Sequence, residues 1–246
     1  RDTDLFFSDR VTKDSQILYD RDPRVRVSKV APYLTLDSRV YPAVVDMDGN
    51  PKTPKRLVWI LDGDTTTNQY PYSARQSLNE ATVDAKSKGA GQYGESPEQV
   101  NYIRNSVKAV VDAYDGSVKL YQWDKKDPIV NAWSKVFPGT LTPMSKMSGD
   151  LMSHMRYPED MFKVQRTLLS RYHVTNAKEF YSGGDFWDVP QEPTAPKGST
   201  EDQPPYYLTL QMPGQDKAQF SLSTGFILGG ADKQNVMTGF LAVDSE

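Results

Sequence analysis

Two alternating runs of apolar and polar residues, on either side of the pair 115–116, give the clearest structural signal in the chain. Over 107–123 the apolar positions recur every second residue, which is typical of strands with one buried face. Asp115-Gly116 is typical of a two-residue hairpin turn. We therefore predict a hairpin that bends at 115–116. In this hairpin six pairs of residues are predicted to lie opposite each other. They are Ala113 and Val118, Val111 and Leu120, Ala109 and Gln122, Asp112 and Lys119, Val110 and Tyr121, and Lys108 and Trp123.

Other apolar runs predict further strands. Residues 57–61 are apolar on both faces, which indicates a strand covered on two sides. Near the end of the chain, alternating runs are separated by Pro213-Gly214 and Gly229-Gly230, which predicts an antiparallel meander. The strands predicted outside the 107–123 hairpin are 41–46, 56–62, 206–212, 219–228 and 236–243.

Helices are predicted where an N-cap residue precedes an apolar pattern of helical spacing. Asp22-Pro23 and Asp127-Pro128 combine a capping side chain with proline at the first helical position, where the missing N–H does no harm. After Pro158, an apolar stripe is expected to face the core; it comprises Met161, Phe162, Gln165, Leu168, Leu169 and Tyr172. The predicted helices are 22–31, 73–86, 127–137, a short one capped by Ser148, one from Pro158 to 172, and one or two turns in 175–181.

Strands in hairpins and helices in a cluster, without strand–helix–strand alternation, predict the α+β class. We expect mostly antiparallel hairpins, a C-terminal meander and a cluster of short helices. We also expect one domain over 1–246, with flexible loops near 85–97, which is rich in Gly, and 191–205, which is rich in Pro.

Composition excludes several function classes. Lys and Arg number 29 against 32 Asp and Glu, a net charge of −3, so we expect no nucleic-acid partner. The absence of cysteine excludes disulfides, thiolate catalysis and Cys-bound zinc, and two histidines cannot form a three-His metal site. No apolar run approaches the ~18 residues of a transmembrane helix. The chain begins with Arg1 instead of Met, so we interpret it as a segment of a larger protein.

Several blocks of the sequence resemble the bacterial uncharacterised protein family 0182 (UPF0182). The resemblance covers most of the chain, and the loops at 47–55 and 85–97 look longer than the family pattern. The blocks are ILYDRDPR at 17–24, YPAVVD at 41–46, NYIRNSVK at 101–108, VDAYDG at 111–116, FPG at 137–139, RYPED at 156–160, FKVQR at 162–166, FWDVP at 186–190 and YYLTL at 206–210.

The resemblance implies a large membrane protein with N-terminal transmembrane helices followed by a soluble region. It places this chain in that soluble region, on the extracytoplasmic side of the cell membrane. The expected partners are the remainder of the same membrane protein and an envelope ligand or protein. The family carries no established activity, catalytic residues or cofactor that could be transferred to this chain.

Two acidic segments are candidates for cation binding. Asp46, Asp48 and Asn50 share the spacing of a calcium loop, but the twelfth position is Leu57 instead of Glu, which favours a hairpin turn. The segment 62–66 (DGDTT) is expected to close a strand, where its side chains could hold a cation or a sugar but more readily cap a turn.

Histidines and paired acids offer candidate catalytic groups. His154 follows Asp150 by four residues, a spacing that suits a base and its orienting carboxylate, but a structural hydrogen bond is the favoured interpretation. His173 is expected at a helix C-terminus, and Glu159 and Asp160 in a first helical turn, where the helix dipole stabilises such charges.

The segment 181–188 (YSGGDFWD) is the best candidate for a binding loop. Two glycines bend it, and aromatic residues flank its acids, as in interfaces and equally in loops anchored to their own core. The chain contains no P-loop, G-x-S-x-G or H-E-x-x-H motif. We therefore expect a non-catalytic binding or structural module. The alternatives are a cell-envelope hydrolase that uses paired carboxylates and a calcium-stabilised module.

Overall fold

A five-stranded sheet forms the centre of the fold. The computed structural model describes residues 12–15, 19–88, 99–230 and 236–244. The strands lie in the order β1 (Thr35–Val45), β2 (Arg56–Thr67), β7 (Tyr102–Asp112), β8 (Val118–Gln122) and β9 (Leu141–Pro143). All neighbours are antiparallel except β8 and β9. The predicted α+β class with mainly antiparallel pairing is confirmed.

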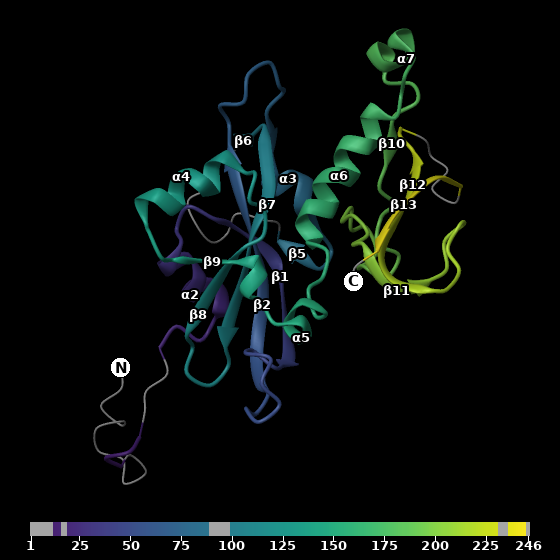
Figure 1. The fold of residues 1–246 in the computed structure, drawn as a ribbon. Helices are drawn as coiled ribbons and strands as arrows, with labels where there is room; N and C mark the ends of the chain where they lie inside the picture. Colours follow the sequence, from purple (N-terminus) through teal and green to yellow (C-terminus); the bar gives the residue numbers. More distant parts are fainter. Residues whose placement is uncertain (1–11, 16–18, 89–98, 231–235, 245–246) are drawn as a thin grey trace.

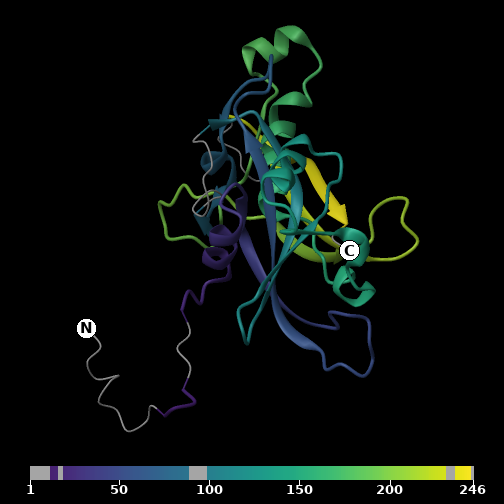
Figure 2. The same cartoon turned by 60° about the vertical axis from the view of Figure 1, so that its left-hand side comes forward.

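Helices cover the sheet on both faces, as the two-sided apolar pattern of 57–61 predicts. On one face Leu61 and Val107 pack against α2 (Pro23–Val30) and α4 (Pro128–Val136). On the other face Val58 and Ile60 pack against Leu151 of α5 (Gly149–Met152). Figures 1 and 2 show this layered arrangement, with α2 and α4 on the side of the sheet opposite α6 (Glu159–Tyr172).

The helix starts follow their predicted caps. Asp22, Asp127 and Ser148 accept backbone hydrogen bonds at the first turns of α2, α4 and α5, and Asn176 does the same for α7 (Ala177–Ser182). These caps satisfy N–H groups that have no partner within the helix. A short 3₁₀ helix, η1 (Met144–Lys146), lies between β9 and α5.

The C-terminal strands form the predicted meander. β12 (Gln219–Leu228) pairs antiparallel with β11 (Tyr206–Leu210) and β13 (Met237–Asp244), and its end also pairs with the two-residue β10 (Trp187–Asp188). In Figure 1 this sheet lies beside α6. Tyr207 of β11 connects this sheet to the segment that precedes α6. Its hydroxyl donates to the carbonyl oxygen of Tyr157 (3.2 Å), and its ring lies under Arg156.

The register predicted for the 107–123 hairpin is wrong by two residues. The observed pairs are Val111–Val118, Ala109–Leu120 and Val107–Gln122, with Val110 opposite Lys119 and Lys108 opposite Tyr121. The turn encloses four residues instead of two: the N–H of Asp112 donates to the carbonyl of Ser117, and the Asp112 side chain accepts from Tyr114 N and Asp115 N. The Asp112 carboxylate pairs with Arg56 instead of Lys119. A shift of two residues keeps every side chain on its predicted face, so the two-layer packing survives.

The helix predicted over 73–86 is also wrong. Only α3 (Leu78–Thr82) is helical, between β3 (Gln76–Ser77) and β4 (Val83–Asp84), which pair with β6 (Gln99–Val100) and β5 (Ser87–Lys88). The Asp84 side chain accepts from Lys86 N and Ser87 N and so forms a turn that ends any helix there. Most of the loop predicted near 85–97 lies outside the described residues. The 191–205 segment contains turns and one isolated bridge, Gln191–Asp202.

Candidate functional site

Helix α6 buries its charged face and exposes much of its apolar one. Its buried residues recur at helical spacing on one stripe: Glu159, Asp160, Phe162, Lys163 and Arg166. Of the apolar stripe predicted to face the core, Phe162 is fully buried, whereas Leu168 is 40% exposed and Tyr172 is 58% exposed. The predicted stripe is therefore only partly buried, and charged residues make up most of the buried face. The reason is a set of ionic partners that come from distant segments.

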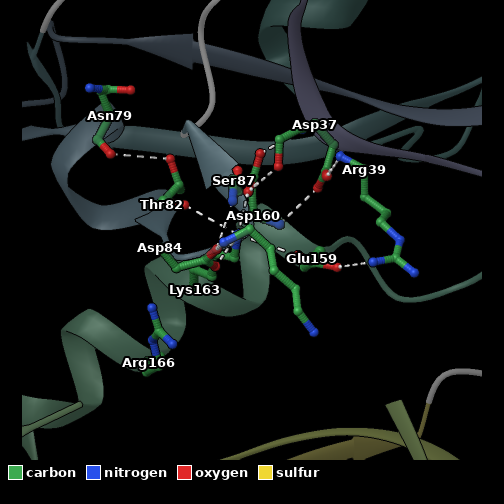
Figure 3. A network of polar contacts seen from close by, with 12 residues as sticks. Asp37, Arg39, Asn79, Thr82, Asp84, Ser87, Glu159, Asp160, Lys163 and Arg166 are labelled. Carbon is green, nitrogen blue, oxygen red and sulfur yellow. Dashed lines mark hydrogen bonds and ion pairs between the residues drawn. The ribbon is translucent and has the colours of Figure 1, made fainter. Parts of the chain in front are cut away.

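Lys163 is the centre of this buried ionic cluster (Figure 3). Its Nζ lies 2.7 Å from Asp84 Oδ2, 3.3 Å from Glu159 Oε1 and 3.4 Å from Asp160 Oδ1. It also donates to the carbonyl oxygen of Thr82 (3.2 Å). The side chains of Lys163, Asp84 and Asp160 are inaccessible to solvent. A buried ammonium is tolerated only when carboxylates surround it in this way.

A bulge in β1 holds the N-terminus of α6. Pro158 offers no capping side chain, and Asp37 takes that role, because its Oδ2 accepts from Asp160 N at 2.8 Å. In return, Asp160 accepts from the N–H (2.7 Å) and the hydroxyl (2.9 Å) of Ser38. The pairing of β1 with β2 shifts between Leu36 and Val40, which frees these residues to face the helix.

Burial shifts the protonation equilibria of this cluster. Desolvation, followed by repulsion from Asp160, raises the pKa of Asp37 well above its usual value. Burial likewise raises the pKa of Glu159 and of Asp160 against the attraction of Lys163. For Lys163 burial acts in the opposite direction, but its carboxylates outweigh it and raise its pKa. Lys163 is therefore a cation that holds α6 to Thr82 of α3 and to Asp84 of β4.

The acidic segment 62–66 is part of the same buried region and not a turn. β2 continues through it to Thr67, so Asp62 and Asp64 lie inside the sheet and are almost fully buried. Asp62 pairs with Lys108, and Asp64 accepts a hydrogen bond from the Asn105 amide at 2.9 Å. The predicted strand end at Asp62 is wrong, because polar partners on β7 compensate the buried carboxyls.

One carboxylate of the predicted binding loop, Asp188, reaches a solvent-accessible hollow. A cavity of about 520 Å³ lies between α6 and the C-terminal sheet, and Glu80, Asp188 and Asp202 line it together with Arg171. Desolvation raises the pKa of Asp202. Within the loop, Trp187 stacks on His173 (3.6 Å) and packs on Phe226, whereas Tyr181 is 90% exposed. Trp187 thus anchors the loop to its own core, whereas the Tyr181 side chain extends into solvent.

The candidate calcium loop uses its carboxylates on its own backbone. Asp46 Oδ1 accepts from Asp48 N and Gly49 N, Asp48 Oδ1 accepts from Asn50 N, and Asn50 Oδ1 accepts from Lys52 N. These bonds shape the β1–β2 hairpin turn. In the part of the chain that the structure describes, no three His, Asp or Glu side chains are placed to hold a metal ion.

A calcium titration tests the turn interpretation. We expect added calcium or a chelator to leave the melting temperature of the chain unchanged, and equally so in Asp48→Asn, because the oxygens of the turn already accept backbone N–H groups. Differential scanning fluorimetry measures this. A calcium-dependent rise that Asp48→Asn abolishes would instead establish a metal site.

The two histidines make backbone contacts. His154 Nδ1 lies 2.7 Å from the carbonyl oxygen of Asp150, while the Asp150 carboxylate accepts from Asp46 N and pairs with Lys55, so this histidine and this carboxylate are not a base and its orienter. His173 is at the C-terminus of α6, as predicted, with Nδ1 near Leu169 O (2.7 Å) and Nε2 near Asp185 O (3.0 Å).

Comparison with known proteins identifies the family. The pattern of the Uncharacterised protein family (UPF0182) matches residues 1–246. The chain belongs to this family. UPF0182 proteins of Bifidobacterium longum and Paenarthrobacter aurescens are 55% and 53% identical to it, over 98% and 99% of this chain. A UPF0182 protein of Kineococcus radiotolerans is 51% identical over the whole chain. No solved structure matches the chain.

The chain corresponds to 22–24% of the length of these UPF0182 relatives. Among the residues that the structure describes, none of the helices has the length and hydropathy needed to cross a bilayer.

Sequence reasoning missed the central residues of the cluster, namely Lys163, Asp84, Asp37 and Lys108. One signal was present: Lys163 follows Glu159 by four residues and Asp160 by three, the spacings at which opposite charges meet on a helix. A surface ion pair has the same spacing, so the pattern could not show that this one is buried.

Proposed function

We propose that this chain is a non-catalytic docking module of a UPF0182 protein, on the extracytoplasmic side of the membrane, and that the rest of the same polypeptide packs on α6. The observation that carries this proposal is the reversed polarity of α6. A helix that buries charged side chains in its own domain and leaves part of its apolar stripe exposed is suited to a second partner.

Three apolar residues of α6, Val164, Leu168 and Tyr172, line a groove of about 410 Å³, which we call the α6 groove. Its other wall comes from α3, β6 and β7, so it is bounded on two sides by regular elements. The apolar and aromatic lining consists of Ala74, Leu78, Ala81, Val100, Tyr102, Ile103, Val164, Leu168 and Tyr172. Such a groove fits an apolar segment of a partner chain.

The partner that fits best is the remainder of the UPF0182 protein. Relatives match this chain almost end to end, yet the chain spans only 22–24% of their own length. More than three quarters of such a protein is therefore covalently attached to this segment. Tethering gives the attached chain a high effective concentration at the groove, which favours it over a separate protein.

Photocrosslinking in the full-length protein tests the docking role. With p-benzoylphenylalanine in place of Tyr172, we expect crosslinks to peptides outside the 246 residues. The matched control is Tyr114, a tyrosine of similar exposure (69%) in the β7–β8 turn, remote from the groove, where no such crosslink is expected. Equal crosslinking from both positions, or none from Tyr172, would contradict docking at this groove.

Cysteine labelling tests the location. This segment contains no cysteine, so Thr53→Cys in the exposed β1–β2 turn introduces a unique thiol into it. We expect a membrane-impermeant maleimide to label this thiol in intact cells. Leu222→Cys, at a buried position, is the control and should react only after denaturation. Labelling of Thr53→Cys that requires cell lysis would place the segment in the cytoplasm.

A second candidate function, glycan hydrolysis, has one specific observation in its favour. Asp202 has a raised pKa, as a general acid requires, and shares the 520 Å³ hollow with Asp188. If the hollow is catalytic, Asp202→Asn should abolish release of sugars from purified cell-wall glycan by the full-length protein. Wild-type protein that releases none would leave docking as the function.

A further inference from the structure

The carboxyl of Asp64 and the amide of Asn105 lie directly opposite each other inside the sheet. They are cross-strand partners on β2 and β7, at the point where the register shifts by one residue. Side chains of such partners point to the same face at short range. The bulge turns Ser106 toward Asp127 on the other face and leaves Asn105 to face Asp64.

Two buried acceptor atoms in this pair have no hydrogen-bond partner. Asn105 Nδ2 donates to Asp64 Oδ1 at 2.9 Å, but Asp64 Oδ2 and Asn105 Oδ1 are both buried without any partner among the described residues. With Asp64 ionised, these two atoms cannot bond to each other, because both are acceptors. A proton on Asp64 Oδ2 satisfies both atoms, because the new O–H group donates to Asn105 Oδ1. The two side chains are then joined by a ring of two hydrogen bonds.

We infer that Asp64 is a proton-binding site, which holds a proton at neutral pH and shares it with the Asn105 amide. A buried acceptor without a hydrogen bond destabilises the folded chain, and this contact would contain two of them if Asp64 were ionised. The inference needs no ligand other than the proton. It is independent of the docking role proposed for α6.

The surrounding charges favour the neutral acid. Asp37 on β1, Asp62 on β2 and Asp160 on α6 each repel a negative charge at Asp64, and Lys108 on β7, which already pairs with Asp62, is the cation that attracts it. Burial, aided by the repulsion from Asp62 and Asp160, outweighs the hydrogen bond from Asn105 and the attraction of Lys108, and it raises the pKa of Asp64 to about 8. Mildly alkaline solution therefore removes the proton and adds a charge to an acidic cluster that connects β2 with α6.

Infrared spectroscopy of the full-length protein tests this site directly. The difference spectrum between wild type and Asp64→Asn at neutral pH should contain the carbonyl stretch of a protonated carboxyl, and the band should disappear in alkaline solution. Asparagine preserves both hydrogen bonds to Asn105, so this variant is expected to fold. Asp115→Asn, at an exposed turn where a bond from Ser117 lowers the pKa, is the control and should give only carboxylate bands. A carboxylate band for Asp64 at neutral pH would overturn the inference.

The pH dependence of stability gives a second, independent readout. Because the folded chain binds a proton that the unfolded chain releases, stability falls as pH rises from the usual aspartate range to about 8. The denaturation midpoint of wild type should therefore drop more than that of Asp64→Asn between ~pH 5 and ~pH 9. Parallel curves for the two proteins would contradict a protonated Asp64, because the variant has no proton to lose at this position.

Discussion

Replacement of Lys163 by methionine is expected to lower the free energy of unfolding by about 3–5 kcal/mol, the largest effect of any single change considered for this chain. Methionine fills a similar volume but leaves Asp84, Glu159 and Asp160 without their common cation. Uncompensated carboxyls in a site closed to solvent must either take up protons or admit water. Chemical denaturation of the 246-residue chain, followed by the fluorescence of its four tryptophans, measures the loss.

Two variants separate the ionic cause from a general loss of packing. Lys178→Met removes an exposed lysine on α7 and should change stability by less than about 0.5 kcal/mol. The second variant combines Lys163→Met with Asp84→Asn, Glu159→Gln and Asp160→Asn. It should recover part of the lost stability, because the neutral side chains no longer need a cation. A loss below about 1 kcal/mol in Lys163→Met alone would mean that the cluster is open to water.

Asp127→Ala is expected to destabilise the chain by about 3 kcal/mol, well beyond the loss of an ordinary helix cap. Asp127 accepts backbone hydrogen bonds from the first turn of α4, and its carboxylate also accepts from three hydroxyls on β2 and β7. These hydroxyls belong to Thr65, Ser106 and Tyr102. Alanine removes all of these acceptors and leaves buried donors unsatisfied.

Asp22→Ala is a matched control, because Asp22 also precedes a proline at the start of a helix but lies nearer the surface, where it caps α2 and pairs with Arg24. We expect it to cost about 1 kcal/mol, as helix caps do. Equal losses in the two variants would contradict the role of the hydroxyls.

The Asp127 carboxylate also makes the stability of the chain sensitive to acid. Burial raises the pKa of Asp127, but the hydrogen bonds from Ser106, Thr65 and Tyr102 outweigh burial and hold the pKa below its usual value. The stabilising contribution is therefore complete above the aspartate range and is lost as pH falls through the lowered pKa. Denaturation curves in acid should converge for wild type and Asp127→Ala. Curves that remain parallel in acid would mean that Asp127 does not titrate differently in the folded chain.

Local rules predicted the elements that depend on neighbours in sequence. The Asp22-Pro23 and Asp127-Pro128 starts, the C-terminal meander and the two-sided strand at 57–61 are all short-range patterns, and the structure contains them. The turn after β7 was mispredicted, because the side chain of Asp112 organises a four-residue loop that the Asp-Gly pair alone does not indicate.

The site depended on residues far apart in the sequence and could not be predicted. Lys163 meets Asp84 across 79 positions, and the capping of α6 by Asp37 spans 123. Charged residues are ordinarily assigned to the surface, so apolar spacing could not indicate that α6 buries four charged side chains beside Phe162. Asp62 and Asp64 were assigned to a turn for the same reason, although their partners on β7 make burial possible.

The most direct measurement of the central claim is the reactivity of a thiol in the α6 groove. In the 246-residue structure Tyr172 and Val44 are similarly exposed, at 58% and 56%. In the full-length UPF0182 protein, Tyr172→Cys should react with a maleimide far more slowly than Val44→Cys in the native state, and at the same rate after denaturation. Equal native rates would show that the apolar face of α6 stays in solvent and that nothing docks there.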